Sequence, residues 1–182
     1  MRGIFAVDPG GHTGIAWCIL NERHQGYAWE AVRDRQHSAS CTIDGTEREQ
    51  IRALYILWTS FKRRCVKTHQ MEPGWIDLVV EDFVLFPGEK PGRQTTIPER
   101  VAWGFEGYRM AMYDKYRPQL DPPRKHMSPT IWQKSAAASR FFKDRELMTQ
   151  ADCWIKGREH ERSAFAHIIL RTNILMDGHA PA

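Results

Sequence analysis

The chain has 182 residues, of which 42% are hydrophobic and 26% are charged, so it is long enough to bury a core and too apolar to be wholly disordered. Its formal net charge is +4, and its lysines and arginines gather in segments such as FKRRCVK, EKPGRQ, PPRKH and SRFFKDR, which are typical either of a solvated surface or of a surface that binds a polyanion. Four cysteines without a CxxC pair argue against a zinc knuckle or a disulfide scaffold, and the lack of a signal peptide or of an apolar run of roughly 18 residues favours the cytoplasm.

The N-terminal part of the chain is predicted to form strands. Residues 3–8 form an apolar run, and residues 14–20 resume as a second apolar run after a glycine-rich turn, so the two predict an antiparallel hairpin. The segment GYAWEAV, residues 26–32, predicts a third strand. Residues 33–47 are polar and predict a loop.

A long helix and a buried strand come next. Residues 47–64 carry apolar side chains at intervals of three and four, and Thr46 with Glu49 predicts a capping box at the start of the helix. The run DLVV, residues 77–80, then predicts a fully buried strand. A buried strand after a helix indicates a crossover into a parallel neighbour.

The remaining segments alternate basic loops with helices. Residues 85–100 read as a Pro/Gly-rich basic loop, and a helix is expected from about 98 to 116. A short strand is possible within residues 117–126. A helix capped by Ser-Pro is expected over 128–142, and the last helix over about 158–175. Strands first, then helices alternating with strands, predict one mixed α/β domain over residues 1–182.

Two carboxylates stand where buried strands end. Asp8 closes the first strand, and Glu81 closes the strand that contains DLVV. A buried carboxylate must be paired, hydrogen-bonded or bound to a cation, and two of them at one edge of a sheet would suit a divalent ion such as Mg²⁺. The alternatives are an Asp8 that only caps the Pro-Gly turn and a Glu81 that is a solvated strand end.

Three segments carry a resemblance to a known family. IFAVDPGGHTGIAW resembles the opening hairpin of RuvC-type Holliday junction resolvases, and DLVVEDF is similar to the second acidic motif of that family, which falls on Glu81. KGREHERSAFAHIIL is similar to the closing helix of small phage-encoded members, where His or Asp is followed three residues later by Asp; these positions fall on His160 and Ser163. The matching positions in the first segment are Asp8, Pro9, Gly10, Thr13 and Gly14.

The resemblance implies a fold, an activity and partners. The fold would be ribonuclease H-like, a mixed five-stranded sheet with three antiparallel strands and then parallel ones, flanked by helices. The activity would be metal-dependent hydrolysis of phosphodiesters in four-way or branched DNA. Asp8, Glu81 and His160 would hold Mg²⁺ or Mn²⁺, as two ions, with no nucleotide cofactor and no membrane. The protein would be a homodimer, with the helix at 98–116 as its candidate interface.

Ser163 departs from the family pattern, which has a carboxylate at this position. The chain either works with a reduced set of ligands or is a catalytically impaired junction-binding protein; a broader flap or branched-DNA nuclease is a third reading. Glu159 and Glu161 are expected to lie on other helical faces than Ser163, so neither is expected to replace the missing carboxylate easily. Taken alone, His160 could be a capping or surface histidine. His167 is interpreted as a core-edge or DNA-side residue rather than a ligand.

Several further side chains are candidates for DNA contact. Phe86 lies in a basic loop, where it could wedge into a branch point or stack on an unpaired base. The residues expected to contact the phosphate backbone are Lys90, Arg93, Arg124, Lys125, Lys134 and Arg140. Four other aromatic residues are expected in the core: Trp17, Trp58, Trp103 and Phe105.

Overall fold

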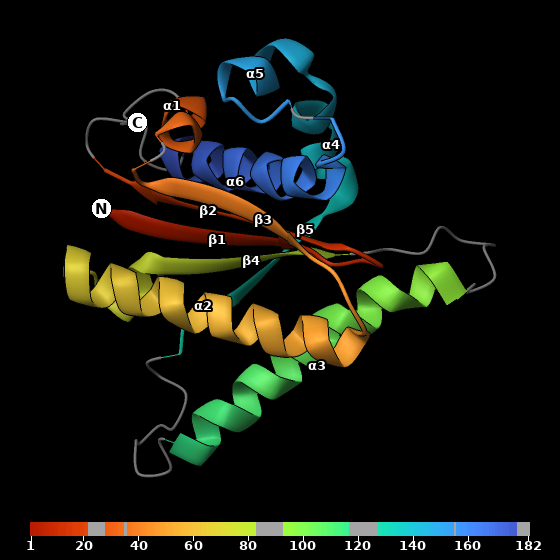
Figure 1. The fold of residues 1–182 in the computed structure, drawn as a ribbon. Coiled ribbons are helices and arrows are strands. Elements are labelled where there is room, and N and C mark those ends of the chain that lie inside the picture. Colours follow the sequence, from red (N-terminus) through yellow and green to blue (C-terminus); the bar gives the residue numbers. More distant parts are fainter. Residues whose placement is uncertain (22–27, 35, 83–92, 117–126, 155, 178–182) are drawn as a thin grey trace.

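A mixed five-stranded sheet lies at the centre of the molecule, and helices cover both of its faces (Figure 1). The computed structural model describes residues 1–21, 28–34, 36–82, 93–116, 127–154 and 156–177. The strands stand in the order β3-β2-β1-β4-β5. Their bounds are Arg2–Asp8 (β1), Thr13–Leu20 (β2), Ser38–Ile43 (β3), Ile76–Asp82 (β4) and Thr130–Lys134 (β5). Strands β1, β2 and β3 pair antiparallel, whereas β4 is parallel to both β1 and β5, which confirms the predicted fold class.

The helices form two layers with the sheet between them. The bounds are Ala28–Arg33 (α1), Glu47–His69 (α2), Arg93–Tyr116 (α3), Ser135–Lys143 (α4), Arg145–Gln150 (α5) and Glu159–Asp177 (α6), with a short 3-10 turn at Pro73–Trp75 (η2). Helix α6 lies against one face with α1, α4 and α5 around it, and α2 and α3 lie on the other face (Figure 1).

The sheet divides the apolar core in two because successive strand residues point to opposite faces. From β1, Ile4 and Ala6 join the cluster beneath α6, whereas Phe5 and Val7 join the cluster beneath α2 and α3. Both faces of β1 and β4 are therefore buried, which explains why their sequences are continuous apolar runs.

Helix α2 begins as the sequence predicts and ends later. The Thr46 hydroxyl accepts from the backbone amide of Glu49, and the Glu49 carboxylate accepts from the backbone amide of Thr46, so the capping box is confirmed. The helix continues to His69, beyond the predicted 47–64, and Gln70 ends it in a left-handed conformation with φ of 53°.

The third strand lies later in the chain than predicted. Residues 26–32 are not a strand, because α1 occupies Ala28–Arg33 and buries Ala31 and Val32 in the cluster beneath α6. The strand β3 instead comes from SASCTI, inside the segment predicted as a loop. An edge strand with one paired neighbour tolerates small polar residues, so its sequence lacks the apolar alternation by which strands are recognised.

The fifth strand also replaces a predicted helix. Residues 128–142 were expected to be helical throughout, but Thr130–Lys134 form β5, and the helix starts only at Ser135. Ser128 does not cap a helix: its hydroxyl donates to the carbonyl oxygen of Pro73, at 3.2 Å. The tertiary pairing with β4 therefore overrides the local Ser-Pro signal.

A buried ion pair ties α3 to the start of β5. Arg109 donates two hydrogen bonds to the Glu106 carboxylate, at 3.0 and 2.8 Å, and also donates to the Ser128 carbonyl and the Thr130 hydroxyl. These partners satisfy a buried charge that would otherwise be costly.

The short strand expected within 117–126 lies outside the described residues. Among the described helices, none is long and apolar enough to cross a membrane.

Candidate active site

Two buried carboxylates meet at one end of the sheet. Asp8 ends β1, and Glu81 stands next to the end of the adjacent parallel strand β4, so the strand register carries both to the same edge. Their side chains are 14% and 8% exposed, and the two carboxyl groups share a hydrogen bond. The structure therefore brings together the two strand-end carboxylates that the sequence singled out; their role as metal ligands stays a prediction.

The first turns of α6 add two more of the predicted residues. Nδ1 of His160 lies 3.2 Å from Oδ2 of Asp8, and the Ser163 hydroxyl donates to Oε2 of Glu81 at 3.4 Å. All four side chains face one pocket of about 430 Å³. The pocket is completed by Gly10 and Gly11 of the turn after β1, Pro98 of α3, and Ser135, Ser139 and Phe142 of α4.

Gly14 explains how α6 comes so close to the hairpin. A Cβ atom at this position would lie 2.1 Å from the backbone carbonyl oxygen of His160 and 2.8 Å from the backbone nitrogen of Glu161. Only glycine leaves room for this approach. Gly14, the glycine of the Thr-Gly pair after the turn, therefore has a packing role: it leaves room for the helix that brings His160 to Asp8.

Glu161 fixes the same turn of α6 from the other side. Its carboxylate accepts hydrogen bonds from the hydroxyls of Ser40, at 2.6 Å, and Thr42, at 3.2 Å, both on β3, and Arg158 lies 3.8 Å away. The side chain is 7% exposed. Glu161 thus points away from the pocket, as its helical position predicted, and anchors α6 to a strand that the sequence did not identify.

The turn after β1 is held by a residue that the sequence analysis missed. Gln50, in the first turns of α2, is buried; it accepts from the Thr13 hydroxyl and donates to the backbone oxygens of Gly11 and Gly45, both at 3.0 Å. The Gly10 amide points at the Thr13 hydroxyl, at 3.4 Å. A polar residue on the buried side of a predicted amphipathic helix is the signal that could have found Gln50.

The pKa values of the two carboxyl groups shift in opposite directions. Burial, together with the neighbouring charge of Glu81, raises the pKa of Asp8 to about 8. Burial acts in the same direction on Glu81, but its interactions with His167, Asp8 and Ser135 outweigh burial and lower the pKa of that carboxyl to about 2. The hydrogen bond to Asp8 raises the pKa of His160. Without a cation, the pair therefore retains one proton across much of the neutral range.

The donor set fits a hard divalent cation in part. Two adjacent carboxylates with no lysine or arginine lining the described part of the pocket favour a positive ligand, and oxygen donors with one imidazole suit Mg²⁺ or Mn²⁺. Among the described residues, however, no three His, Cys, Asp or Glu side chains already form a metal-binding cluster. Asp8 and Glu81 would hold an ion whose other ligands come from water or from a phosphate.

Two side chains of α6 lie elsewhere than the sequence suggested. Glu159, expected on another face from Ser163, lines the same pocket; it is exposed, and its Oε1 accepts from the Gly157 amide at 3.2 Å. His167 is neither at the core edge nor on a DNA side: it is fully buried, with Nε2 3.4 Å from Oε2 of Glu81. Glu81 therefore meets two residues of α6 that stand four positions apart, Ser163 and His167.

The predicted DNA-contact residues are described only in part. Lys134, at the end of β5, and Arg140, on α4, are exposed on the segment that also lines the pocket, and the Arg140 guanidinium lies over the Phe141 ring at 4.5 Å from its centroid. Arg93 begins α3. The structure does not describe the side chain of Arg93, and Phe86, Lys90, Arg124 and Lys125 lie outside the described residues.

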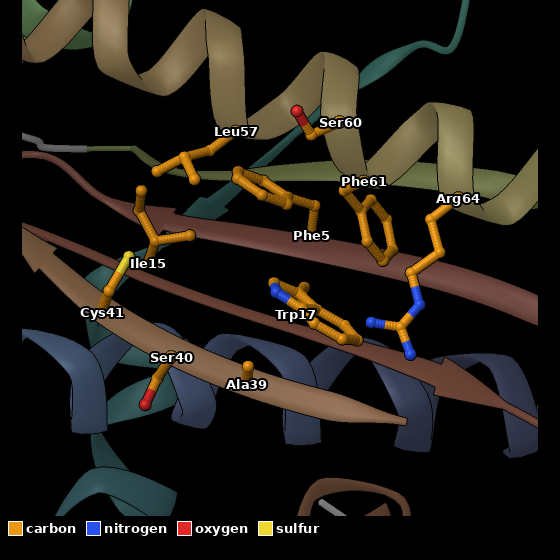
Figure 2. A pocket seen from close by; sticks show the side chains of 10 residues that line it. All are labelled: Phe5, Ile15, Trp17, Ala39, Ser40, Cys41, Leu57, Ser60, Phe61 and Arg64. Atoms are coloured by element: carbon orange, nitrogen blue, oxygen red, sulfur yellow. The ribbon is translucent and has the colours of Figure 1, made fainter. Parts of the chain in front are cut away.

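The predicted core position is confirmed for two aromatic residues and is wrong for a third. Trp58 and Phe105 are in the core as expected, whereas the core position expected for Trp103 is wrong: it is 63% exposed and stacks on Trp132, with ring centroids 4.7 Å apart. Trp17 is partly buried and lines a second pocket of about 240 Å³ between α2 and strands β1, β2 and β3 (Figure 2). That pocket is mainly apolar, with Arg64 as its charged side chain, and it holds none of the carboxylates.

The comparisons with known proteins give the fold. No family model matches the chain, and no curated protein does. Among solved structures, RuvC of T. thermophilus in complex with a Holliday junction substrate has 12% identity, with 98% of this chain and 97% of that chain covered and a TM-score of 0.50. A second Thermus thermophilus RuvC structure has 10% identity, 97% coverage of both chains and a TM-score of 0.53. The chain therefore has a RuvC-like, ribonuclease H-like fold, while its place among small phage-encoded members stays a prediction.

Gly14→Ala should destabilise the protein by about 2–3 kcal/mol, because the added methyl group overlaps the backbone of His160. Gly107→Ala is the matched control: a methyl group there meets nothing within 4 Å, and alanine favours the α3 helix. Urea unfolding measures both variants. Equal stability of the two would show that the close approach of α6 at Gly14 is not needed.

The metal-free protein should lose stability as the pH rises toward about 8. The folded-state pKa of Asp8 is raised from 3.8 to about 8, so its contribution is complete below 3.8 and is lost through about 8; the raised pKa of His160 acts with the same sign. Asp8→Asn removes both effects and should flatten the profile. Unfolding in urea with a chelator, from pH 4 to 9, measures this, and parallel profiles for the two proteins would contradict it.

Proposed function

We propose that this protein is a structure-selective endonuclease that binds four-way or otherwise branched DNA and cleaves it by metal-dependent phosphodiester hydrolysis. The observation that carries the proposal is the pair of buried carboxylates, Asp8 and Glu81, which face one open pocket with His160 and Ser163 on a RuvC-like fold. A structurally similar protein has been solved with a Holliday junction substrate, which supports the substrate class.

Asp8 and Glu81 would hold Mg²⁺ or Mn²⁺, and His160 would either serve as a further ligand or assist the attacking water. When bound, divalent ions in such a site activate a water and stabilise the leaving 3′ oxygen of an in-line displacement. The Asp8 carboxyl must give up its proton to bind a cation, because its pKa is raised to about 8. Cation affinity should therefore increase with pH up to that value.

The pocket leaves room for a DNA backbone. Gly10 and Gly11 bring no side chains to its rim, and the space where a Cβ of Gly11 would stand has no atom within 4 Å. Lys134 and Arg140 flank the pocket and would contact phosphates without reading bases. The remaining candidates for DNA contact belong to the same proposal: Phe86, Lys90, Arg93, Arg124 and Lys125.

Paired cuts on a four-way junction need two sites, so we propose a homodimer with α3 as its interface. The exposed ring of Trp103, stacked on Trp132, lies on this helix and offers an apolar surface for a partner.

Ser163 favours a second candidate function. Where the resemblance implies a carboxylate, the structure has a neutral hydroxyl that donates to Glu81 instead of adding charge to the pocket. A site with one carboxylate fewer would bind cations less tightly. The second candidate is therefore a junction-binding protein of the same fold with little or no cleavage activity.

Asp8→Asn should abolish cleavage while leaving DNA binding in place. We expect symmetric paired nicks in a synthetic four-way junction with Mg²⁺ or Mn²⁺, reduced in the variant by at least the ~100-fold that the loss of a supporting group can cost. Asp177→Asn, at the exposed end of α6, is the control. Binding without cleavage by the unaltered protein in either metal would favour the junction-binding function, and preferential cutting of flaps would favour a broader nuclease.

Ser163→Asp should strengthen cation binding and increase cleavage by about 10-fold or more, because it restores a carboxylate beside Glu81. Ser139→Asp is the matched control, since it adds the same charge to the same pocket from α4. Titration with Mn²⁺ and the junction assay measure the two effects. An equal gain in both variants would mean that added charge, and not the position of residue 163, is responsible.

A further inference from the structure

His167 is a buried histidine that the proposed chemistry does not yet use. It stands on α6 seven residues after His160, and its ring lies between two polar side chains of adjacent strands. Nδ1 is 3.0 Å from the amide oxygen of Gln133 on β5, and Nε2 is 3.4 Å from Oε2 of Glu81 on β4. Glu81 and Gln133 are themselves direct partners in the parallel register.

Two buried nitrogens of this group have no hydrogen-bond partner among the described residues. With the Gln133 oxygen facing Nδ1, the neutral ring carries its proton on Nδ1, so that Nε2 presents a lone pair to the Glu81 carboxylate. Nε2 of His167 and Nε2 of Gln133 then have no hydrogen-bond partner among the described residues. Two orphaned buried nitrogens in one contact are unusual for a folded protein.

Rotating the Gln133 amide by half a turn turns both nitrogens toward polar atoms. The amide oxygen and nitrogen are nearly equivalent in shape, so that either can face the ring. With the nitrogen facing Nδ1, Gln133 donates to the ring, and the imidazole carries its proton on Nε2. That Nε2–H would then face Oε2 of Glu81, which lies 3.4 Å from Nε2.

We propose that His167, held in its Nε2–H form by Gln133, is a positioning residue that orients the carboxylate of Glu81 within the site. This inference rests on the proposed nuclease function, because it concerns how that function's second carboxylate is held. Oε2 of Glu81 receives both this hydrogen bond and the one from Ser163, so two residues of α6 fix the orientation of one side chain of β4. Such supporting hydrogen bonds set ligand geometry in metal sites.

A pair of variants separates positioning from simple burial. His167→Gln places an amide donor near the position of Nε2, whereas His167→Asn reaches only as far as Nδ1. Both variants bury an uncharged amide of similar polarity. If His167 positions Glu81, the glutamine variant should retain Mn²⁺ binding close to that of the unaltered protein, and the asparagine variant should bind Mn²⁺ about 10–100-fold more weakly.

Two measurements on the full chain test the inference. Calorimetric titration with Mn²⁺ compares the variants, and nitrogen-15 NMR of the histidine rings in the metal-free protein reports which nitrogen of His167 carries the proton. We expect the Nε2–H form, with the Nε2 signal altered in Glu81→Gln. An Nδ1–H ring would overturn the inference, and so would an equal loss of Mn²⁺ binding in the asparagine and glutamine variants.

The NMR result also distinguishes the two proposals. If the unaltered protein neither binds Mn²⁺ nor cuts a junction, the proposed function fails. The ring state of His167, and its response to Glu81→Gln, would still decide whether this histidine donates to Glu81. If either His167 variant fails to fold, the spectrum of the unaltered protein gives the same answer.

Discussion

The whole site depends on how closely the start of α6 approaches the β1–β2 hairpin. Gly14 permits that approach, since any side chain there would overlap the backbone of His160. Glu161 then locks the helix to β3 through Ser40 and Thr42. With its first turn fixed in this way, α6 brings His160 to Asp8. Further along the helix, Ser163 and His167 meet Glu81.

The second constraint is charge. Two carboxylates share a pocket whose described lining holds no lysine or arginine, so that one of them keeps a proton or a cation takes its place. The pKa values of Asp8 and Glu81 move in opposite directions because burial, with the charge of Glu81 added to it, raises that of Asp8, whereas interactions with His167, Asp8 and Ser135 outweigh burial at Glu81. The metal-free arrangement is therefore one that a divalent ion would relieve.

The residues that contact this pair or the turn beside it lie on both sides of the carboxylates, and the sequence motifs did not identify most of them. Gln50 holds the turn after Asp8 from α2, and His167 with Gln133 meets Glu81 from α6 and β5. Ser163 belongs to the same set, since its hydroxyl also meets Glu81. Ser163 thus brings no charge to the pocket, and its hydroxyl contacts Glu81.

Several elements of the fold can be predicted from short-range sequence patterns. The hairpin that carries Asp8, the strand that ends near Glu81, the capped start of α2 and the last helix all follow from apolar runs, spacing and caps within about 20 residues. Tertiary structure decided the rest. Strands β3 and β5 exist because neighbouring strands pair with them, and Ser163 and His167 meet Glu81 across more than 80 positions of sequence. Such contacts leave no local periodicity, because packing and hydrogen bonding between distant elements create them.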